Sequence, residues 1–336
     1  MFAALNEVTD MSRKQIGTRT LCSVLCLLTL AGCAPSEQTT PYRSEQALTE
    51  GAVVLEDEAV ALAQSPAALT TQVTVQATGV RVKQNEQAVI DYSNAAQGYV
   101  MVCYTQPTDL RLKAQVKGPS TTYTYNLAPG EWAVFPLSDG NGAYRVTIYK
   151  NVQGSSYAAV LSLTTQVVLA DEFAPFLHSN QYVDFDNAPR TTALAAQLIG
   201  GETDPLKKVE TVYDYVVRGL TYDRELAATV KSGYLPDLDR VLEKKSGICF
   251  DYAALMTGML RSQGVPCKLV VGFAGSAYHA WISVWSEQTG WVDGAIFFDG
   301  HSWKRMDPTF ASSGRQSEAI MAYIGDGENY HAKYFY

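Results

Sequence analysis

The sequence has few of the residues that build metal sites and disulfide frameworks. Its 336 residues include four histidines and six cysteines, with no Cys-x-x-Cys pair and no histidine cluster. Zinc sites and disulfide scaffolds need such groupings at regular spacing, so neither is expected. We therefore expect no metal and no cofactor.

The sequence also lacks a dense stripe of lysine and arginine. Its formal net charge is −8, and its basic residues are scattered along the chain. Nucleic-acid binding depends on a concentrated positive surface, so nucleic acid is not expected as a partner. A hydrophobic content of 47% with 18% charged residues is typical of a folded protein.

The apolar run near the N-terminus is too short to span a membrane. It extends from Leu21 to Leu30, after basic residues at 13, 14 and 19, and it leads into Ala31-Gly32-Cys33. A basic region, a short apolar region and a small-residue cleavage site are typical of a secretory signal. The pattern resembles a bacterial lipoprotein signal, in which Cys33 becomes the lipidated first residue of the mature protein.

We therefore predict a signal peptide over residues 1–32 and a lipid anchor at Cys33, on the extracellular face of a bacterial cell membrane. Residues 33–70 are rich in Ser, Thr, Gln, Glu and Ala, without a sustained apolar period. Such a composition is typical of a flexible tether. Cys103 and Cys267, in contrast, lie in apolar surroundings and are expected to be buried core residues.

Residues 71–170 show the alternation of apolar and polar residues that is typical of β-strands. Examples are Gln72–Ala77, Leu110–Val116 and Ala143–Tyr149, with turn signals such as Asp139-Gly140-Asn141-Gly142 between strands. About seven short strands in about 100 residues favour an all-β, sandwich-like domain. No residue pattern here indicates chemistry, so we expect a spacer, with polymer binding as the alternative.

Helical patterns begin near residue 189 and indicate a second domain over residues 171–336. Asp204-Pro205 and Asp237 are candidate helix starts, and Cys249 opens a further helix that stops at Gly264. Strand-like runs follow at 268–273, 279–285, 296–298 and 303–307. The predicted architecture is therefore an α+β domain preceded by the sandwich-like domain.

Three residues of the second domain fit nucleophilic catalysis. Cys249 follows Gly247, which lets the backbone turn sharply, at a predicted helix start; His279 opens a strand-like run and Asp307 ends another. A helix N-terminus favours a thiolate, a histidine accepts the thiol proton, and an aspartate orients the imidazole. Each residue alone is usually structural, so the prediction depends on their order and combination.

These motifs resemble the transglutaminase-like family, a branch of the papain-like thiol enzymes. The resemblance covers about residues 205–310, and it implies a papain-like fold with Cys249, His279 and Asp307 as a catalytic triad. The segments that carry it are Val216–Asp223, Lys245–Leu260, Gly264–Gly272, His279–Trp281 and Trp303–Thr309.

The sequence departs from the family at the oxyanion donor. Many cross-linking members carry a tryptophan upstream of the nucleophile, and none occurs here between residues 132 and 281. The Cys249 backbone N–H is one natural donor. We predict the Tyr234 hydroxyl as the second, with Tyr222 as the alternative, and a structural role is as compatible with either ring. Asp251 is expected to bond backbone near the helix start.

The predicted reaction is thiol-dependent acyl transfer on a peptide or protein amide, through a thioester at Cys249. With water as acceptor the protein would be a cysteine peptidase or amidase, and with an amine it would be a transglutaminase. Water access decides between them, and the residue pattern leaves both open. Cell-wall peptides are candidate substrates for a surface protein. The alternative is a non-catalytic binding or assembly module of the cell envelope that retains the fold.

Overall fold

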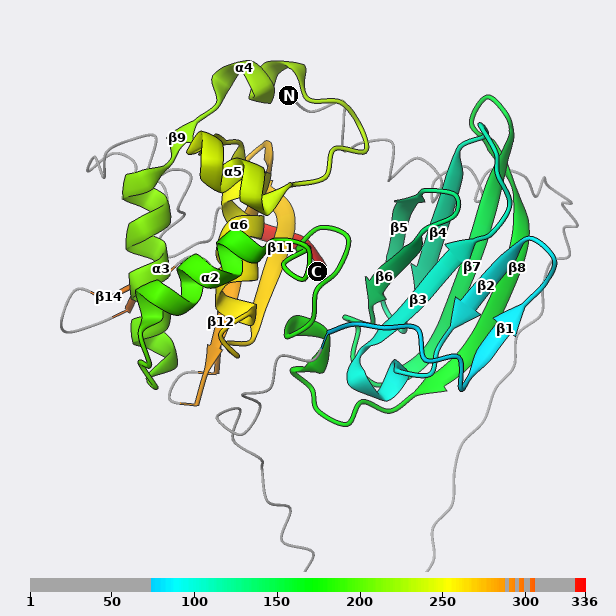
Figure 1. The fold of residues 1–336 in the computed structure, drawn as a ribbon, viewed down its shortest axis with the longest axis horizontal. Coiled ribbons are helices and arrows are strands. Elements are labelled where there is room, and N and C mark those ends of the chain that lie inside the picture. The colour runs from blue at the N-terminus through cyan, green and yellow to red at the C-terminus, as the bar shows by residue number, and fades with distance from the viewer. Residues whose placement is uncertain (1–73, 288–289, 294–295, 299–302, 306–329) are drawn as a thin grey trace, which may run out of the picture. The chain divides into compact units, whose positions relative to one another are not determined.

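The computed structural model describes residues 74–336, apart from 288–289, 294–295, 299–302 and 306–329 (Figure 1). The predicted signal peptide, the lipidation site Cys33 and the tether therefore lie outside the described residues, as does Asp307. No helix within the described ranges is long and apolar enough to cross a membrane.

Two four-stranded antiparallel sheets make up the described chain before residue 168. One has the strand order β1-β2-β3-β6 and the other β5-β4-β7-β8 (Figure 1). Buried residues alternate along the strands, as Leu112, Ala114 and Val116 do in β4, so each sheet turns an apolar face inward. The strands are Val82–Gln84 (β1), Ala88–Asp91 (β2), Tyr99–Tyr104 (β3), Leu112–Lys117 (β4), Thr122–Leu127 (β5), Trp132–Pro136 (β6), Gly142–Gln153 (β7) and Ser156–Val167 (β8).

The predicted strand at Gln72–Ala77 is wrong over its described part. Residues 74–78 have no regular secondary structure despite their apolar alternation. Backbone N–H groups of this segment donate to side chains instead of a strand partner, from Val75 to the Asp186 carboxylate and from Gln76 to the Tyr99 hydroxyl. Alternation of apolar and polar residues therefore does not produce a strand when no neighbouring strand is available to pair with the segment.

Five α-helices and a four-stranded antiparallel sheet, β13-β12-β11-β16, dominate the described chain from residue 189 onward. Asp204 accepts the Leu206 N–H and Asp237 accepts the Arg240 N–H, which confirms both predicted helix starts. The helices are Pro189–Ile199 (α2), Pro205–Gly219 (α3), Arg224–Thr229 (α4), Leu238–Lys244 (α5) and Cys249–Arg261 (α6). The strands are Thr221–Tyr222 (β9), Ser246–Gly247 (β10), Cys267–Ala274 (β11), Ala277–Ser286 (β12), Gly290–Asp293 (β13), Ile296–Phe298 (β14), Trp303–Arg305 (β15) and Tyr330–Phe335 (β16).

The predicted fold class, a β-rich region followed by an α+β region, is confirmed. Two elements of the second region are not predicted by the residue pattern. Helix α4 is six residues long and begins after Asp223, whose side chain accepts the Leu226 N–H. Strand β16 pairs with β11, which lies far from it in the sequence, so the local residue pattern does not predict this pairing.

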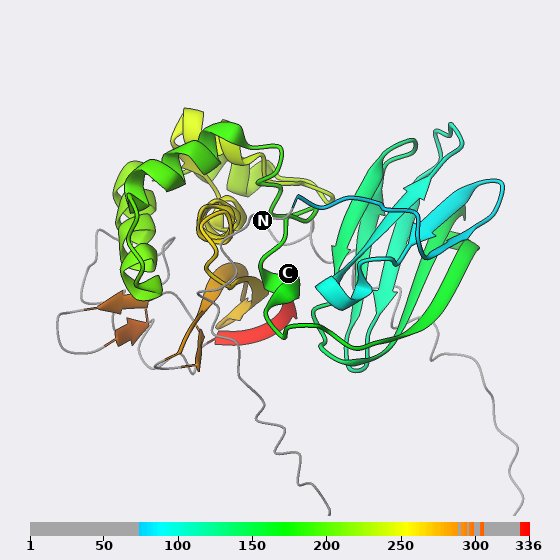
Figure 2. The same cartoon turned by 60° about the horizontal axis from the view of Figure 1, so that its bottom comes forward.

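Helix α6 is the centre of the second region. All 13 of its residues are buried. It packs against β11 and β12 on one side and against α2, α3 and α5 on the other (Figure 2). Gly258 lets α5 approach, because a Cβ there would lie 2.6 Å from a methyl group of Leu238. An apolar helix of this kind is stable only when it is enclosed.

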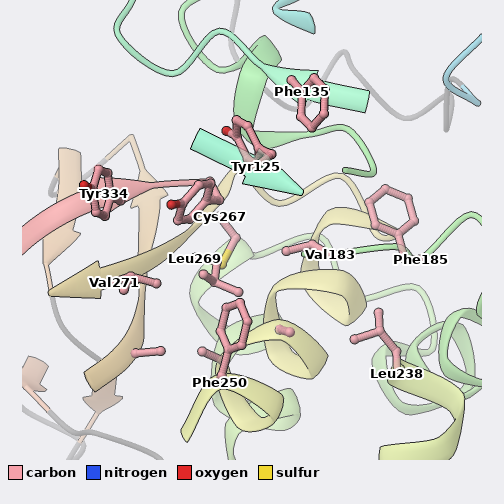
Figure 3. Close-up of a cluster of buried hydrophobic side chains, with 14 of the residues drawn as sticks. Tyr125, Phe135, Val183, Phe185, Leu238, Phe250, Cys267, Leu269, Val271 and Tyr334 are labelled. Atoms are coloured by element: carbon pink, nitrogen blue, oxygen red, sulfur yellow. The ribbon is translucent and has the colours of Figure 1, made fainter. Parts of the chain in front are cut away.

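Aromatic rings continue this core to β5, within the one compact unit to which all described residues belong. The Tyr336 ring packs against Tyr123 and Tyr125, with centroids 5.6 and 5.9 Å away, and against Tyr182 at 4.7 Å. Tyr182 lies 5.4 Å from the Phe250 ring of α6. Tyr125 and Phe250 thus belong to one cluster of buried side chains (Figure 3).

A buried arginine joins three segments to the end of α6. The Arg261 guanidinium donates to the main-chain oxygens of Cys267 at 2.8 Å, His178 at 2.7 Å and Tyr336 at 2.5 Å. Burial lowers the pKa of Arg261 to about 10, so the group stays charged at neutral pH. Hydrogen bonds from a charged donor are stronger than neutral ones, so Arg261 ties these segments to the helix.

Arg261→Met is expected to destabilise the protein by about 3 kcal/mol, because three carbonyl groups lose their charged donor. Arg218→Met is the matched control, since exposed Arg218 makes only a surface ion pair with Asp214, at 2.9 Å; its loss should cost less than about 1 kcal/mol. Thermal unfolding of the purified variants measures the difference. Equal shifts in the two midpoints would contradict the role given to Arg261.

Candidate active site

The chain reaches Cys249 through a tightly held segment. Lys245, just after α5, adopts a left-handed conformation with φ of 49°. Ser246 and Gly247 then form β10, which pairs in parallel with Thr221 and Tyr222 of β9. Cys249 follows as the first residue of α6. The position of the sulfur is therefore set by a strand pair on one side and a buried helix on the other.

Asp251 holds the same segment from within the first turn of α6. Its carboxylate accepts the Ile248 N–H at 2.8 Å and the Tyr234 hydroxyl at 2.7 Å. The side chain is completely buried, and this burial raises the pKa of Asp251 above the ordinary value. The expectation that Asp251 bonds backbone near the helix start is confirmed.

Gly247 is needed for space. A Cβ at this position would lie 2.6 Å from the Cβ of Asp251, closer than two carbon atoms can pack. Its φ does not lie in the left-handed region. The glycine therefore permits close packing on Asp251, rather than the sharp turn that the sequence suggests.

His279 lies on β12, directly opposite Gly272 of β11. The residue is 7% exposed, and its ring centroid lies 6.3 Å from that of Trp281 and 6.4 Å from that of Tyr330. A Cβ at Gly272 would meet the Trp281 ring at 2.8 Å. Because Gly272 has no side chain, the Trp281 ring can pack closely against β11 beside His279.

Cys249 and His279 line one narrow pocket with a volume of about 40 Å³, and Tyr234 lines it with them. A space of this size admits only small groups. Two of the three predicted triad residues and one predicted oxyanion donor thus share a cavity. The other lining residues are Val230, Lys231, Ile248, Phe250, Val271, Tyr278 and Ala280.

The two predicted oxyanion donors are placed differently. Tyr234 lines the pocket, but its hydroxyl donates to Asp251 and accepts from Arg240 at 3.4 Å. Burial, followed by the bond to Asp251, raises the pKa of Tyr234 well above its usual range, so the hydroxyl keeps its proton. Tyr222 lies on β9 and is not among the lining residues.

Sequence reasoning did not anticipate Lys231 as a pocket residue, nor the bond between Tyr234 and Asp251. Both follow from the segment between α4 and α5 folding back over the start of α6. The N-cap Asp237, which begins α5, marks the end of that segment and is a local signal for it. The contact from Tyr234 to Asp251 spans 17 positions and has no periodic signature.

Neither of the two other described cysteines lines the pocket that holds His279. Cys103 and Cys267 are buried, as expected, and burial raises the pKa of both thiols, that of Cys267 to about 11. The structure describes no group of His, Cys, Asp and Glu that could hold a metal ion. Asp307, the third predicted triad residue, lies outside the described residues.

A larger pocket, with a volume of about 410 Å³, lies away from Cys249 and His279. The described part of its lining includes Asp139, Glu172, Lys268 and Trp291, and no cysteine or histidine is among those described residues. Carboxylates without a thiol or an imidazole do not fit acyl transfer through a thioester. Size therefore does not identify the candidate site, and the smaller pocket holds the relevant residue types.

Residues 192–294 match the model of the Transglutaminase-like superfamily. The matched range includes Tyr222, Tyr234, Cys249 and His279, and it ends before Asp307.

Two curated bacterial proteins are similar to this chain. "Uncharacterized protein YebA" of Bacillus subtilis is 25% identical over 181 residues, which are 47% of this chain and 24% of that protein. A protein-glutamine gamma-glutamyltransferase of Pseudomonas aeruginosa is 26% identical over 157 residues, 42% of this chain and 21% of that protein. The chain thus covers less than a quarter of the length of either relative.

A solved structure is also similar, the periplasmic domain of TgpA from Pseudomonas aeruginosa bound to ethylmercury. It is 18% identical, and the match covers 72% of this chain and 78% of that one with a TM-score of 0.34.

Asp251→Ala is expected to destabilise the protein by about 3 kcal/mol, because the Ile248 N–H and the Tyr234 hydroxyl lose their buried acceptor. Asp251→Asn should cost about 1 kcal/mol, since its amide oxygen still accepts from Ile248 while its NH₂ meets the Tyr234 oxygen. Thermal unfolding measures both.

The control for this pair is Asp237→Ala, which removes the exposed cap of α5 and should cost about 1 kcal/mol. If Asp251→Ala shifts the unfolding midpoint no further than Asp237→Ala, the carboxylate does not hold the segment as described.

Proposed function

We propose, from the premise that residues 192–294 of this chain form a transglutaminase-like domain, that the protein transfers acyl groups from peptide or protein amides through a thioester at Cys249. One observation carries the proposal: Cys249, at the first turn of α6, and His279, on β12, line the same pocket. A thiol at a helix N-terminus beside an imidazole is suited to nucleophilic attack, since the helix end favours the thiolate and the imidazole accepts its proton.

In the first half-reaction the Cys249 sulfur attacks the carbonyl carbon of the amide. A C–S bond forms, the C–N bond breaks, and His279 passes the proton taken from the thiol to the leaving amine. In the second half-reaction water or another amine attacks the thioester carbon. A C–O or C–N bond forms, the C–S bond breaks, and His279 passes the proton taken from the attacking group to the sulfur, which restores the thiol. We propose Asp307 as the carboxylate that orients the imidazole.

The oxyanion of the tetrahedral intermediate needs two donors in this scheme. The backbone N–H of Cys249 is the first, because the first N–H groups of a helix have no partner within the helix. Tyr234 is the better placed of the two tyrosines for the second, since it lines the pocket and Tyr222 does not. Its proton must turn from Asp251 to the oxyanion for this role.

The described part of the pocket is narrow. Its space of about 40 Å³ beside the sulfur suits a carboxamide on an unbranched stem better than a bulky group. Side-chain amides and unhindered peptide bonds fit this space, and cell-wall peptides are among the candidates. The lipid anchor at Cys33 and the position on the extracellular face of a bacterial membrane stay predictions from the sequence.

Cys249 is expected to react with iodoacetamide at about pH 6, where an ordinary thiol with a pKa near 8.5 is almost entirely protonated. His279→Ala should slow this reaction about tenfold or more, because the base that takes the proton is gone. Peptide mass spectrometry resolves Cys249 from Cys103 and Cys267, whose buried thiols serve as internal controls.

Turnover is tested in the same preparation with glutamine-containing peptides, with and without an added amine. Cys249→Ala should abolish both release and incorporation of amine while the unfolding midpoint stays near that of the parent. A folded Cys249→Ala variant with undiminished biological activity would instead support the non-catalytic binding module.

Tyr234→Phe is expected to lower kcat about 10- to 100-fold with little change in KM, because it removes a donor used only in the transition state. Tyr222→Phe is the matched control at the tyrosine that does not line the pocket. Full turnover in Tyr234→Phe would remove the hydroxyl from the mechanism.

A further inference from the structure

Among the described residues that line the pocket of Cys249, Lys231 is the one with an ammonium group, and it is exposed at the surface. Among the described residues that line the pocket, none carries a carboxylate. The chain as a whole has a formal net charge of −8, so its surface at large repels anions. A lysine at the rim of this pocket therefore carries the opposite sign to the net charge of the chain.

The turn that carries Lys231 is held at both ends. The Tyr234 N–H donates to the Lys231 carbonyl at 3.3 Å, and Gly233 takes a φ of 87°, the pattern of a turn with glycine in its third position. Tyr234 is anchored on Asp251, and Val230 packs against the hydrophobic core. The backbone of Lys231 is thus fixed next to the pocket, and only its flexible stem is left to move.

The charges behind the pocket do not cancel that of Lys231. The Asp251 carboxylate is buried behind Tyr234, where it accepts two hydrogen bonds. Arg240 lies on the far side of the Tyr234 hydroxyl and adds a second positive charge. The N-terminus of α6, a helix of 13 residues, contributes a partial positive charge at Cys249 itself. Among these described groups positive charge therefore predominates, and the Asp307 carboxylate proposed above would be paired with the His279 ring.

We propose that Lys231 is a specificity-determining residue, which makes the site prefer acyl donors that carry a carboxylate close to the reacting amide. The inference rests on the acyl-transfer function proposed above. The amide enters the narrow pocket toward Cys249, and the carboxylate stays outside it and pairs with the Lys231 ammonium. Donors with a cationic group in the same place are disfavoured, because two like charges would meet at the rim.

Two alkylating reagents of the same shape test the charge preference without a known substrate. Iodoacetate and iodoacetamide react with Cys249 in the same way: a C–S bond forms and iodide leaves. They differ in that the first carries a carboxylate. The quantity measured is the ratio of their second-order rates at Cys249, divided by the same ratio for 2-mercaptoethanol, which removes their intrinsic difference.

The ratio is expected to fall about threefold in Lys231→Ala and about tenfold in Lys231→Glu, as one and two units of charge are removed beside the sulfur. Both effects should shrink in about 0.5 M sodium chloride, because salt screens a charge at the rim. Lys207→Glu is the control; Lys207 is exposed on α3 and does not line the pocket. An unchanged ratio in Lys231→Glu, or an equal fall in Lys207→Glu, would overturn the proposal.

Turnover of peptide substrates provides a second test of the charge preference. The parent protein should turn over a glutamine peptide with a neighbouring glutamate faster than one with a neighbouring lysine. The Lys231→Glu variant should prefer the lysine peptide instead. If the parent turns over both peptides equally, acyl transfer stands and the specificity is wrong. If Cys249→Ala loses nothing, the proposed function is wrong, and the alkylation ratio still decides whether Lys231 attracts anions to this pocket.

Discussion

The enclosure of helix α6 is the constraint on which the rest of the α+β region depends. A helix with every residue buried needs an apolar surface on all sides, and here β11 and β12 supply one side while α2, α3 and α5 supply the other. Enclosure also creates a problem at each end, where backbone groups have no partner within the helix. At the start, Asp251 accepts the Ile248 N–H. At the finish, the N–H groups of residues 262–265 donate to the carbonyl oxygens of the last turn, while Arg261 ties neighbouring segments to the helix through their main-chain oxygens.

The candidate chemistry follows from that arrangement. Because the start of α6 is locked, the sulfur of Cys249 has a defined position relative to β12, where His279 lies among aromatic rings. The β9–β10 pair and the Asp251 carboxylate act on the same few residues before the nucleophile. Preorganisation of this kind suits a reaction in which atoms must meet within a few tenths of an ångström. Tyr234 also belongs to both the fold and the pocket, because its hydroxyl bonds Asp251 at the helix start and the residue lines the pocket.

Much of the architecture could be predicted from the sequence, because the signals are local. Asp204 and Asp237 mark helix starts by their capping bonds, and alternation marks most of the strands of the sandwich. Strand β16 and the bond between Tyr234 and Asp251 could not be predicted, because each depends on a partner distant in sequence, and α4 is only six residues long, too short for a clear periodic signal. The same limit applies within the site: order and residue type point to Cys249 and His279, but only the folded chain shows that they share a pocket with Lys231. Gly247 was recognised as necessary for the wrong reason, since its neighbour Asp251 matters more than its backbone freedom.

Strand β16 has a consequence for the order in which this region folds. Strands β11 and β12 form a hairpin with a short connection, so they can pair early and quickly. Strand β16 must close a long loop before it reaches the other edge of β11, which is slow because the entropy of closure is lost before contacts are gained. Its arrival also delivers Tyr336 to the aromatic cluster and to Arg261. Until that late step, β11 has an open edge able to pair with other chains, and the guanidinium at the end of α6 lacks one of its acceptors.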